Sequence, residues 1–286
     1  MSTKKEQFWT VTARDRDTSL QEFLARQMGV SKRVAKQQID ARVVWVNDRC
    51  VWMAHHALRK DDIVRLTRTV ASPTARSNVP DRIKVLFEDE WFLGIDKPSG
   101  MLSNAADTSA ESIARRMTGI YTLQAVHRLD RDTTGCLLLA KTQAAMDASI
   151  RVFREHHVAK TYRALVFGRW DASSSTLDLP IAEERALTHV TCVRATDVAS
   201  QLIVRIETGR THQIRRHLAM ARHPILGDRQ YGPKEVLDAD LQLVARPMLH
   251  SVEMAMDHPM REGRALKFFA PLPQDYIRWA KKLRIL

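Results

Sequence analysis

The stretch Val126-His127-Arg128-Leu129-Asp130-Arg131-Asp132-Thr133-Thr134-Gly135 places four charged side chains and a turn between two apolar segments, residues 123–126 and 136–140. These segments, Leu-Gln-Ala-Val and Cys-Leu-Leu-Leu-Ala, have the composition of buried strands. A loop held by a buried strand at each end is a rigid place from which to present a carboxylate. Asp130 is therefore the first candidate for a nucleophile or base, provided that it is ionised and lies beside its substrate atom.

Two later segments also concentrate polar side chains at the ends of apolar strands. Tyr162 lies near the start of the strand-like run Lys160–Val166, and its ring could stack on a nucleobase. Arg215 belongs to the segment Glu207–His217, where a strand leads into a helix that Thr211 could cap. An arginine beside a carboxylate lowers the pKa of that carboxylate and holds it ionised.

Each of these side chains also has a purely structural explanation. Asp130 could cap a turn or pair with Arg128 at the surface. Tyr162 could be a core residue with its hydroxyl at the rim, and Arg215 could be one of many solvated arginines. No single residue decides between these explanations, so the order and wording of the segments must be considered together.

Residues 83–286 combine strands and helices and have the length of one large domain. Apolar runs predict strands at 83–87, 92–96, 123–127, 136–141, 161–168, 202–208 and 249–256. Helical spacing predicts helices at 109–117, 143–156, 211–222 and 273–283. Several strands follow one another without a helix between them, which favours an α+β fold with a mainly antiparallel mixed sheet over a doubly wound one.

The first 70 residues form a separate small α/β unit in this interpretation. A helix starts after Thr18-Ser19, a second runs from Ser31 to about Ala41, and strands are predicted at 43–46 and 63–66. This quarter of the chain holds 14 lysines and arginines against eight acidic residues, so it carries half of the net charge. Residues 71–82 contain two prolines and few large apolar side chains, which predicts a linker.

One face of the second N-terminal helix is basic. Lys32, Arg33 and Lys36 are close enough in sequence to share a helix face. Such a face suits a phosphate backbone, because bound lysine and arginine release its counterions. The alternative is an ordinary solvated helix surface.

The whole chain is strongly basic. It has 45 lysines and arginines against 33 acidic residues, a net charge of +12. That excess indicates a polyanionic partner, most often nucleic acid, although an anionic membrane surface also fits. The three cysteines include no CxxC pair, which argues against a disulfide framework or a cysteine zinc site and favours a reducing, cytoplasmic setting. No apolar run is long enough to span a bilayer, and no secretory signal is visible.

Common cofactor and hydrolase motifs are absent. The sequence contains no GxGxxG, GxxxxGK[ST], GxSxG or HExxH. Dinucleotide, P-loop, serine-hydrolase and zincin interpretations therefore have no support. We expect neither a metal ion nor a nucleotide cofactor.

Taken in order, the segments closely resemble the RluA-type pseudouridine synthases. The matching motifs are His127-Arg128-Leu129-Asp130 with its Thr-Thr-Gly turn, Lys160–Ala164, Gly209–Arg215, His223–Asp228 and the earlier Asp96–Met101. The resemblance covers about residues 85–270 and implies the pseudouridine synthase fold. Residues 18–66 resemble the αL-type RNA-binding module, similar to a ribosomal small-subunit protein, that often precedes this domain.

The resemblance also implies roles for individual residues. Asp130 matches the essential catalytic aspartate, and Tyr162 matches the tyrosine that stacks on the target uracil. Arg215 matches the basic residue that pairs with the aspartate. Arg128 matches the arginine thought to fill the space left by the extruded base.

The implied activity is the isomerisation of uridine in RNA, with large-subunit ribosomal RNA as the expected substrate because of the N-terminal module. Transfer RNA is the alternative within this activity. A non-catalytic RNA-binding or ribosome-assembly protein, or a DNA-binding protein, would explain the charge but leaves the polar segments without a purpose. We expect a cytoplasmic monomer.

Overall fold

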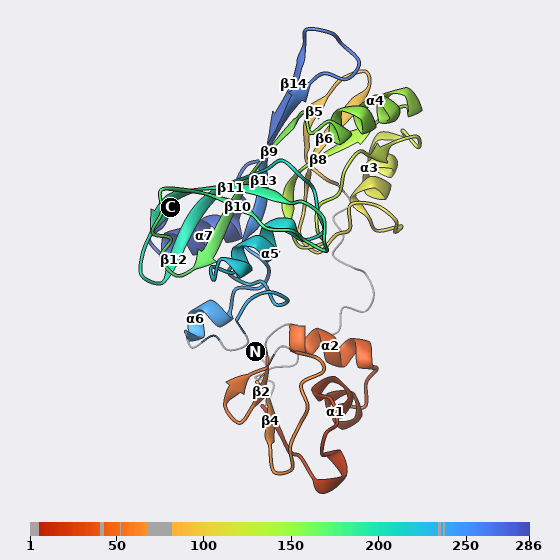
Figure 1. The fold of residues 1–286 in the computed structure, drawn as a ribbon. Coiled ribbons are helices and arrows are strands. Elements are labelled where there is room, and N and C mark those ends of the chain that lie inside the picture. Colours follow the sequence, from red (N-terminus) through yellow and green to blue (C-terminus); the bar gives the residue numbers. More distant parts are fainter. Residues whose placement is uncertain (1–5, 41–42, 52, 68–81, 234–235, 237) are drawn as a thin grey trace. The chain divides into compact units, whose positions relative to one another are not determined.

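The computed structural model describes residues 6–40, 43–51, 53–67, 82–233, 236 and 238–286. The chain divides into two compact units (Figure 1). One comprises Met1–Asn78 with Val236–Ala245, and the other comprises Val79–Glu235 with Arg246–Leu286. The predicted linker at 71–82 lies, apart from Arg82, outside the described residues.

The first unit packs two helices against a small antiparallel sheet. Its elements are β1 (Gln7–Thr10), the 3-10 turn η1 (Ala13–Asp15), α1 (Leu20–Gln27), α2 (Lys32–Asp40), β2 (Val44–Val46), β3 (Arg49–Cys50), β4 (Ile63–Leu66) and the short α6 (Ala239–Gln242). The strand order is β1-β4-β2-β3. Ser19 caps α1 by accepting a hydrogen bond from the Glu22 backbone, and Phe23 and Leu24 of the same helix are fully buried. The apolar side chains at helical spacing thus lie on one face of α1 and form part of the core of the unit.

The second unit is built on one large sheet. Its strands are β5 (Val85–Glu88), β6 (Phe92–Lys97), β7 (Gln124–Ala125), β8 (Thr134–Ala140), β9 (Val158–Phe167), β10 (Ser174–Asp178), β11 (Leu187–Ala195), β12 (Ala199–Ile206), β13 (Leu249–Asp257) and β14 (Ala265–Phe269). The main path runs β10-β11-β12-β9-β13-β8-β6-β5, with β14 on β13 and β7 on β8. Its helices are α3 (Ala110–Thr118), α4 (Gln143–Arg154), α5 (Gln213–Met220) and α7 (Gln274–Lys282).

This sheet is mainly antiparallel and mixed, which confirms the predicted α+β class. Among the described strands, β8 and β13 form the parallel pair, and the other neighbours run antiparallel. Strands β1, β10, β11 and β14 lie where the apolar pattern predicts none. β10, for example, reads Ser-Ser-Thr-Leu-Asp and lies at the end of the sheet path, so backbone pairing with β11 rather than a buried apolar face forms it.

The exit of the loop 126–133 is fixed where β8 meets β13. Gly135 pairs with Ser251 in the parallel ladder and has φ +109°, a conformation that L side chains rarely adopt. A Cβ at this position would lie 2.1 Å from the Ser251 carbonyl oxygen. The close approach of these two backbones therefore requires glycine, and it sets where the loop containing Asp130 begins its return into the sheet.

Replacement of Gly135 by alanine should strongly destabilise the second unit. The new Cβ meets backbone rather than a flexible side chain, so we expect Gly135→Ala to cost at least about 3 kcal/mol of unfolding free energy. Gly119→Ala is the matched control, because Gly119 also has a positive φ, +73°, but nothing lies within 4 Å of its Cβ position. That control should cost only about 1 kcal/mol. Urea unfolding of both full-length variants measures the difference, and equal costs would contradict this account of the β8–β13 contact.

Candidate active site

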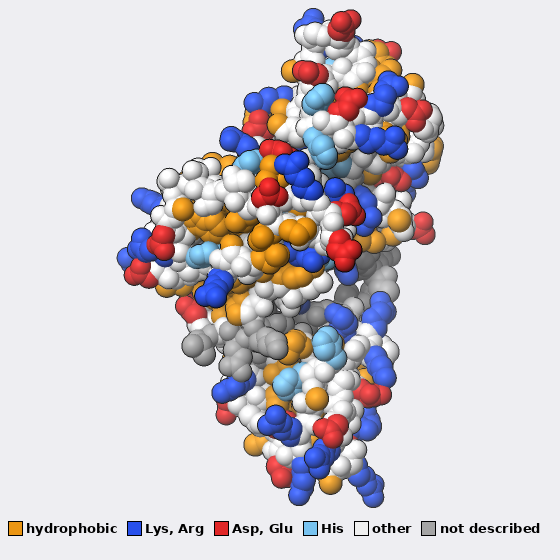
Figure 2. Space-filling model, in the orientation of Figure 1, with side chains coloured by type: hydrophobic (Ala, Val, Ile, Leu, Met, Phe, Trp, Pro, Cys, Tyr) orange, Lys and Arg blue, Asp and Glu red, His pale blue; other side chains and the backbone are white. Residues whose placement is uncertain are grey.

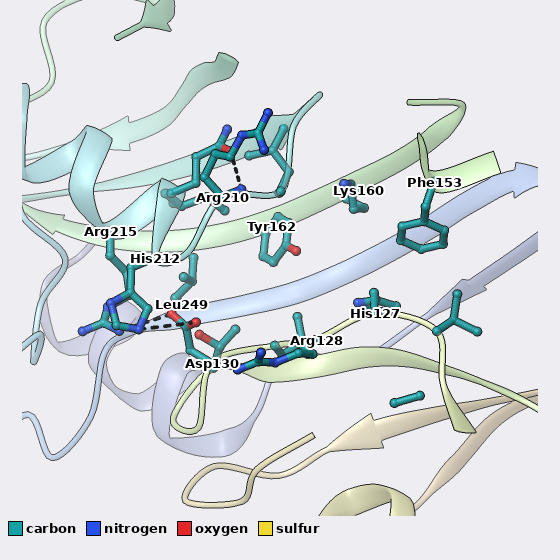
Figure 3. Close-up of a pocket in the computed structure, with 18 of the residues that line it drawn as sticks. His127, Arg128, Asp130, Phe153, Lys160, Tyr162, Arg210, His212, Arg215 and Leu249 are labelled. Carbon is teal, nitrogen blue, oxygen red and sulfur yellow. Dashed lines mark hydrogen bonds and ion pairs between the residues drawn. The ribbon is translucent and has the colours of Figure 1, made fainter. Parts of the chain in front are cut away.

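A pocket of about 430 Å³ brings the sequence-predicted residues of the second unit together (Figure 3). Its walls come from the loop 126–133, from β9, from the segment that leads into α5 and from Leu249 of β13. Asp130, Arg128, Tyr162 and Arg215 all line it. Four side chains separated by up to 87 positions in sequence therefore face one volume of the size that small-molecule sites have.

Asp130 lies at one end of the pocket and pairs with Arg215. Its Oδ2 is 3.2 Å from Arg215 Nη1, and its Oδ1 is 3.7 Å from His212 Nε2 (Figure 3). The Asp130 side chain keeps 27% of its surface exposed, whereas Arg215 keeps 10%. The carboxylate is thus held by a buried cation on one side and open to a ligand on the other.

Arg215 is itself locked by a second carboxylate. Its Nε and Nη2 donate to the two oxygens of Asp228 at 2.6 and 2.9 Å, a bidentate pair. The Asp228 side chain is completely buried, and it also accepts the backbone N–H groups of Gln230 and Tyr231. The third nitrogen, Nη1, is left to face Asp130.

The charge of Arg215 is maintained in spite of its burial. Burial alone would lower the pKa of the guanidinium, but the hydrogen bonds and charges of Asp228, with a further contribution from Asp130, raise it above its ordinary value. The Tyr231 ring lies beneath the guanidinium, 5.1 Å from its central carbon to the ring centroid. Arg215 is therefore a fixed positive charge at the Asp130 end of the pocket.

His212 is a further group beside Asp130. It is the N-cap of α5 and has a left-handed backbone, φ 55°, so the prediction that Thr211 caps this helix is wrong. The helix begins two residues later than predicted because this left-handed residue interrupts it. The His212 ring contacts the Tyr231 hydroxyl at 3.0 Å through Nδ1. Burial lowers the pKa of His212 in spite of Asp130, so the ring is neutral at pH 7.

Tyr162 forms part of the pocket wall across from Asp130 (Figure 3). It lies in the middle of β9, which starts three residues earlier than predicted, and only 6% of its surface is exposed. Burial raises the pKa of its phenol above the ordinary value, so it is protonated at neutral pH. The exposed part of the ring is available to a planar ligand.

Two buried polar side chains hold the loop that carries Asp130. Lys97, fully buried, donates from Nζ to the carbonyls of Pro98, Met101 and Arg131 at 3.0, 2.8 and 3.0 Å. Burial lowers the pKa of Lys97 to about 7, against the opposing charges of Asp132 and Asp130. Ser103 Oγ donates to the Leu129 carbonyl and accepts the Leu129 N–H, both at 2.9 Å. These bonds on either side of Asp130 make the loop rigid.

Of the remaining predicted residues, one lies at the pocket wall and three lie in the first unit. Arg128 is exposed at the pocket wall. Lys32, Arg33 and Lys36 are exposed on α2 of the first unit, and Lys32 Nζ bonds Glu22 Oε1 at 2.8 Å. The structure brings together the four predicted residues of the second unit, and these three belong to the other unit.

Sequence reasoning missed Asp228, His212 and Lys97 as parts of the site. Asp228 ends the otherwise uncharged run Pro224-Ile225-Leu226-Gly227, and an acid after a buried run is a usable signal for a paired charge. Lys97 lies in the matched motif Asp96–Met101, but only the fold shows that its ammonium is enclosed by carbonyls.

Metal and membrane sites are not found in the described part of the chain. No group of three His, Cys, Asp or Glu side chains among these residues is arranged to hold a metal ion. None of the helices described here has the length and apolar character needed to cross a bilayer.

Comparison with known proteins identifies one family. The model of the RNA pseudouridylate synthase family matches residues 92–220. An uncharacterized RNA pseudouridine synthase of Mycobacterium bovis is 32% identical, over 91% of this chain and 92% of the relative. Ribosomal large subunit pseudouridine synthase D of Zymomonas mobilis is 31% identical, over 84% of this chain and 87% of the relative.

Solved structures share the fold. Human RNA pseudouridylate synthase domain containing 4 superposes with a TM-score of 0.62 at 23% identity, covering 70% of this chain and 92% of that chain. A second human structure, RNA pseudouridylate synthase domain containing 1, gives a TM-score of 0.54 at 21% identity over 72% of this chain and 96% of that chain. With relatives above 30% identity along most of its length, the chain belongs to the RluA-type family of RNA pseudouridine synthases.

Proposed function

We propose that Asp130 is the catalytic carboxylate of this pseudouridine synthase. The observation that carries the proposal is the pairing of a partly exposed Asp130 with Arg215, a buried arginine already oriented by Asp228. A charge held in place before substrate arrives needs no reorganisation during the reaction, which makes it effective in stabilising a charged transition state.

The reaction exchanges one glycosidic bond for another. The bond from uracil N1 to ribose C1′ breaks, the uracil turns while bound, and a bond from C5 to C1′ forms. C5 loses a proton and N1 gains one, so atoms and electrons balance within the nucleotide. The reaction involves no net oxidation or reduction, so beside the part taken by Asp130 the residues of this chain must bind, orient and enclose the uracil.

Tyr162 and Arg128 support this reaction by stabilising an extruded nucleotide. Removing a uridine from a stack costs a few kcal/mol, and stacking on an aromatic ring returns about 1–3 kcal/mol. Tyr162 offers that ring inside the pocket, and Arg128, exposed at its wall, is placed to occupy the vacated position. Arg215 holds its positive charge 3.2 Å from the Asp130 carboxylate in a pocket that partly excludes water, which strengthens their attraction.

The proposed substrate is large-subunit ribosomal RNA. Relatives such as the Zymomonas mobilis protein are named for that RNA. Residues 1–70 would serve as an RNA-binding module through Lys32, Arg33 and Lys36, which are exposed on α2. We place this activity in the cytoplasm and expect a monomer. Pseudouridine mapping of total RNA from cells with and without the protein tests the assignment, and a lost site in transfer RNA alone would refute it.

The first prediction from the proposed function concerns Asp130. Asp130→Asn removes the negative charge but keeps the size of the side chain, so pseudouridine formation should fall by at least about 10³-fold while RNA binding survives. Asp147→Asn, an exposed substitution on α4, is the matched control and should leave turnover unchanged. Single-turnover assays on RNA from the deletion strain measure the rate. Near-normal turnover by Asp130→Asn would remove Asp130 from the chemistry.

The second prediction concerns the support of Asp130 by Arg215 and Asp228. Arg215→Met leaves the Asp130 charge without its partner and should reduce the single-turnover rate about 10²-fold or more at saturating RNA. Asp228→Asn keeps an acceptor oxygen but loses the charge, and we expect a smaller loss of about tenfold. A rate unaffected by Asp228→Asn would show that Asp228 does not orient Arg215 for catalysis.

The third prediction concerns the first unit. Replacing Lys32, Arg33 and Lys36 together by alanine should weaken RNA affinity and flatten the dependence of log affinity on log salt by about two units, because each lost phosphate contact contributes about 0.7. The triple variant Arg14→Ala, Arg16→Ala, Lys60→Ala removes the same charge from exposed positions of the same unit. Filter binding between 50 and 300 mM salt compares the two, and equal slopes would refute a specific role for the α2 face.

A further inference from the structure

The end of the pocket opposite Arg215 and His212 is formed by His127, Phe153 and Lys160 (Figure 3). The His127 and Phe153 rings stack, with centroids 5.6 Å apart and an angle of 18° between their planes. Lys160 Nζ lies over the Phe153 ring at 5.7 Å from its centroid. The mechanism above uses none of these three side chains.

Lys160 differs from Arg215 and Arg210, two other cations of the pocket, in having no anionic partner among the described residues. Arg215 pairs with Asp228 and Asp130, and Arg210 pairs with Glu184. Within the described residues, Lys160 makes neither a hydrogen bond nor an ion pair through Nζ. Gly209 has no side chain to fill the space beside Nζ, because a Cβ at that position would lie 3.9 Å from it.

Burial lowers the pKa of Lys160, and no carboxylate of the described chain offsets that effect. The adjacent His127 does not provide a counter-charge for Lys160 either. Its Nε2 accepts the Leu138 N–H at 3.2 Å, and burial lowers its pKa to about 3, so the ring is neutral. A half-buried cation without a counter-charge is a favourable binding site for an anionic ligand that enters the pocket.

The position of Lys160 relative to Tyr162 indicates which anion this is. The two residues are two positions apart on β9, so their side chains leave the same face of the strand about 7 Å apart at the backbone. Both line the pocket. A nucleotide whose base lies on Tyr162 carries phosphates on each side of its ribose, and one of them can reach the far end of the pocket.

We propose that Lys160 binds a backbone phosphate flanking the uridine that stacks on Tyr162. This proposal rests on the proposed role of Tyr162. A lysine acts on phosphate as a point charge without demanding a fixed geometry. Lys160 would thereby fix the distance between the RNA backbone and Asp130, and it would favour the extruded nucleotide over the stacked one.

The first test compares Lys160→Met with Lys281→Met, which removes the same charge from an exposed position on α7. Lys160→Met should raise the RNA concentration for half-maximal turnover about five- to tenfold and flatten the salt slope by about 0.7. The rate at saturating RNA should stay within about threefold. Lys160→Arg should restore most of the affinity, because it keeps the charge. Lys281→Met should behave as wild type.

The substrate for these assays is total RNA from cells lacking the protein, with the modified uridine read by sequencing. That RNA contains the target whether it is ribosomal or transfer RNA, so a wrong substrate class does not prevent the test. Failure of Asp130→Asn to lose turnover would refute the proposed catalysis separately. Thermal unfolding of each variant identifies a folding defect. If Lys160→Met has one, the comparison of Lys160→Arg with wild type and the modified RNA substrates described below test the phosphate contact instead.

The second test neutralises the RNA instead of the protein. Short substrates around the mapped uridine carry one uncharged methylphosphonate linkage at a time, each after a 2′-deoxynucleotide, with the all-phosphate oligonucleotide of the same deoxy pattern as control. One linkage next to the target should weaken wild-type binding as much as Lys160→Met does, and it should have little further effect in that variant. Additive losses at every linkage, or a lower saturating rate with an unchanged salt slope, would overturn the phosphate contact.

Discussion

The bidentate pair between Arg215 and Asp228 is the interaction on which the site depends. Asp228 is completely buried and already accepts two backbone N–H groups, so it has a single orientation. Two of the Arg215 nitrogens are thereby occupied, and only Nη1 faces Asp130. Because a buried ion pair is strong only when its geometry is satisfied, this arrangement turns a flexible arginine into a fixed charge.

The other half of the site is held by hydrogen bonds to the backbone and by close backbone packing rather than by ion pairs. Lys97 and Ser103 bind the loop on both sides of Asp130, and Gly135 allows β8 to approach β13 closely where that loop ends. The carboxylate and its arginine thus come from two different rigid elements that meet at one end of the pocket. Such preorganisation suits a reaction in which the base is detached, turned and rejoined without leaving the enzyme.

Charge in this protein is distributed in two ways. The general excess of lysine and arginine, whose side chains are spread over the face drawn in Figure 2, attracts RNA at long range, which the net charge of +12 already indicates. The pocket, in contrast, contains two kinds of cation. Arg215 is paired with carboxylates, whereas Lys160 has no anionic partner among the described residues. Only a cation fixed in the pocket can select one position of the RNA backbone, because the general positive charge acts on any polyanion.

The sequence by itself determined the α+β class, the strands that flank Asp130 and the family resemblance, because apolar runs and motif order are local properties that survive without coordinates. It also marked Asp130, Tyr162 and Arg215 as residues of interest. It could not determine β10 or β11, which contain several polar residues and form through pairing with neighbouring strands. Nor could the sequence predict that Asp228 pairs with Arg215, or that Lys160 has no anionic partner among the described residues. The first relation depends on how the chain returns from α5 to β9, where Ile225 bridges Val166, and the second depends on what surrounds Lys160 in the folded pocket; charge pairing depends on distance in space rather than in sequence.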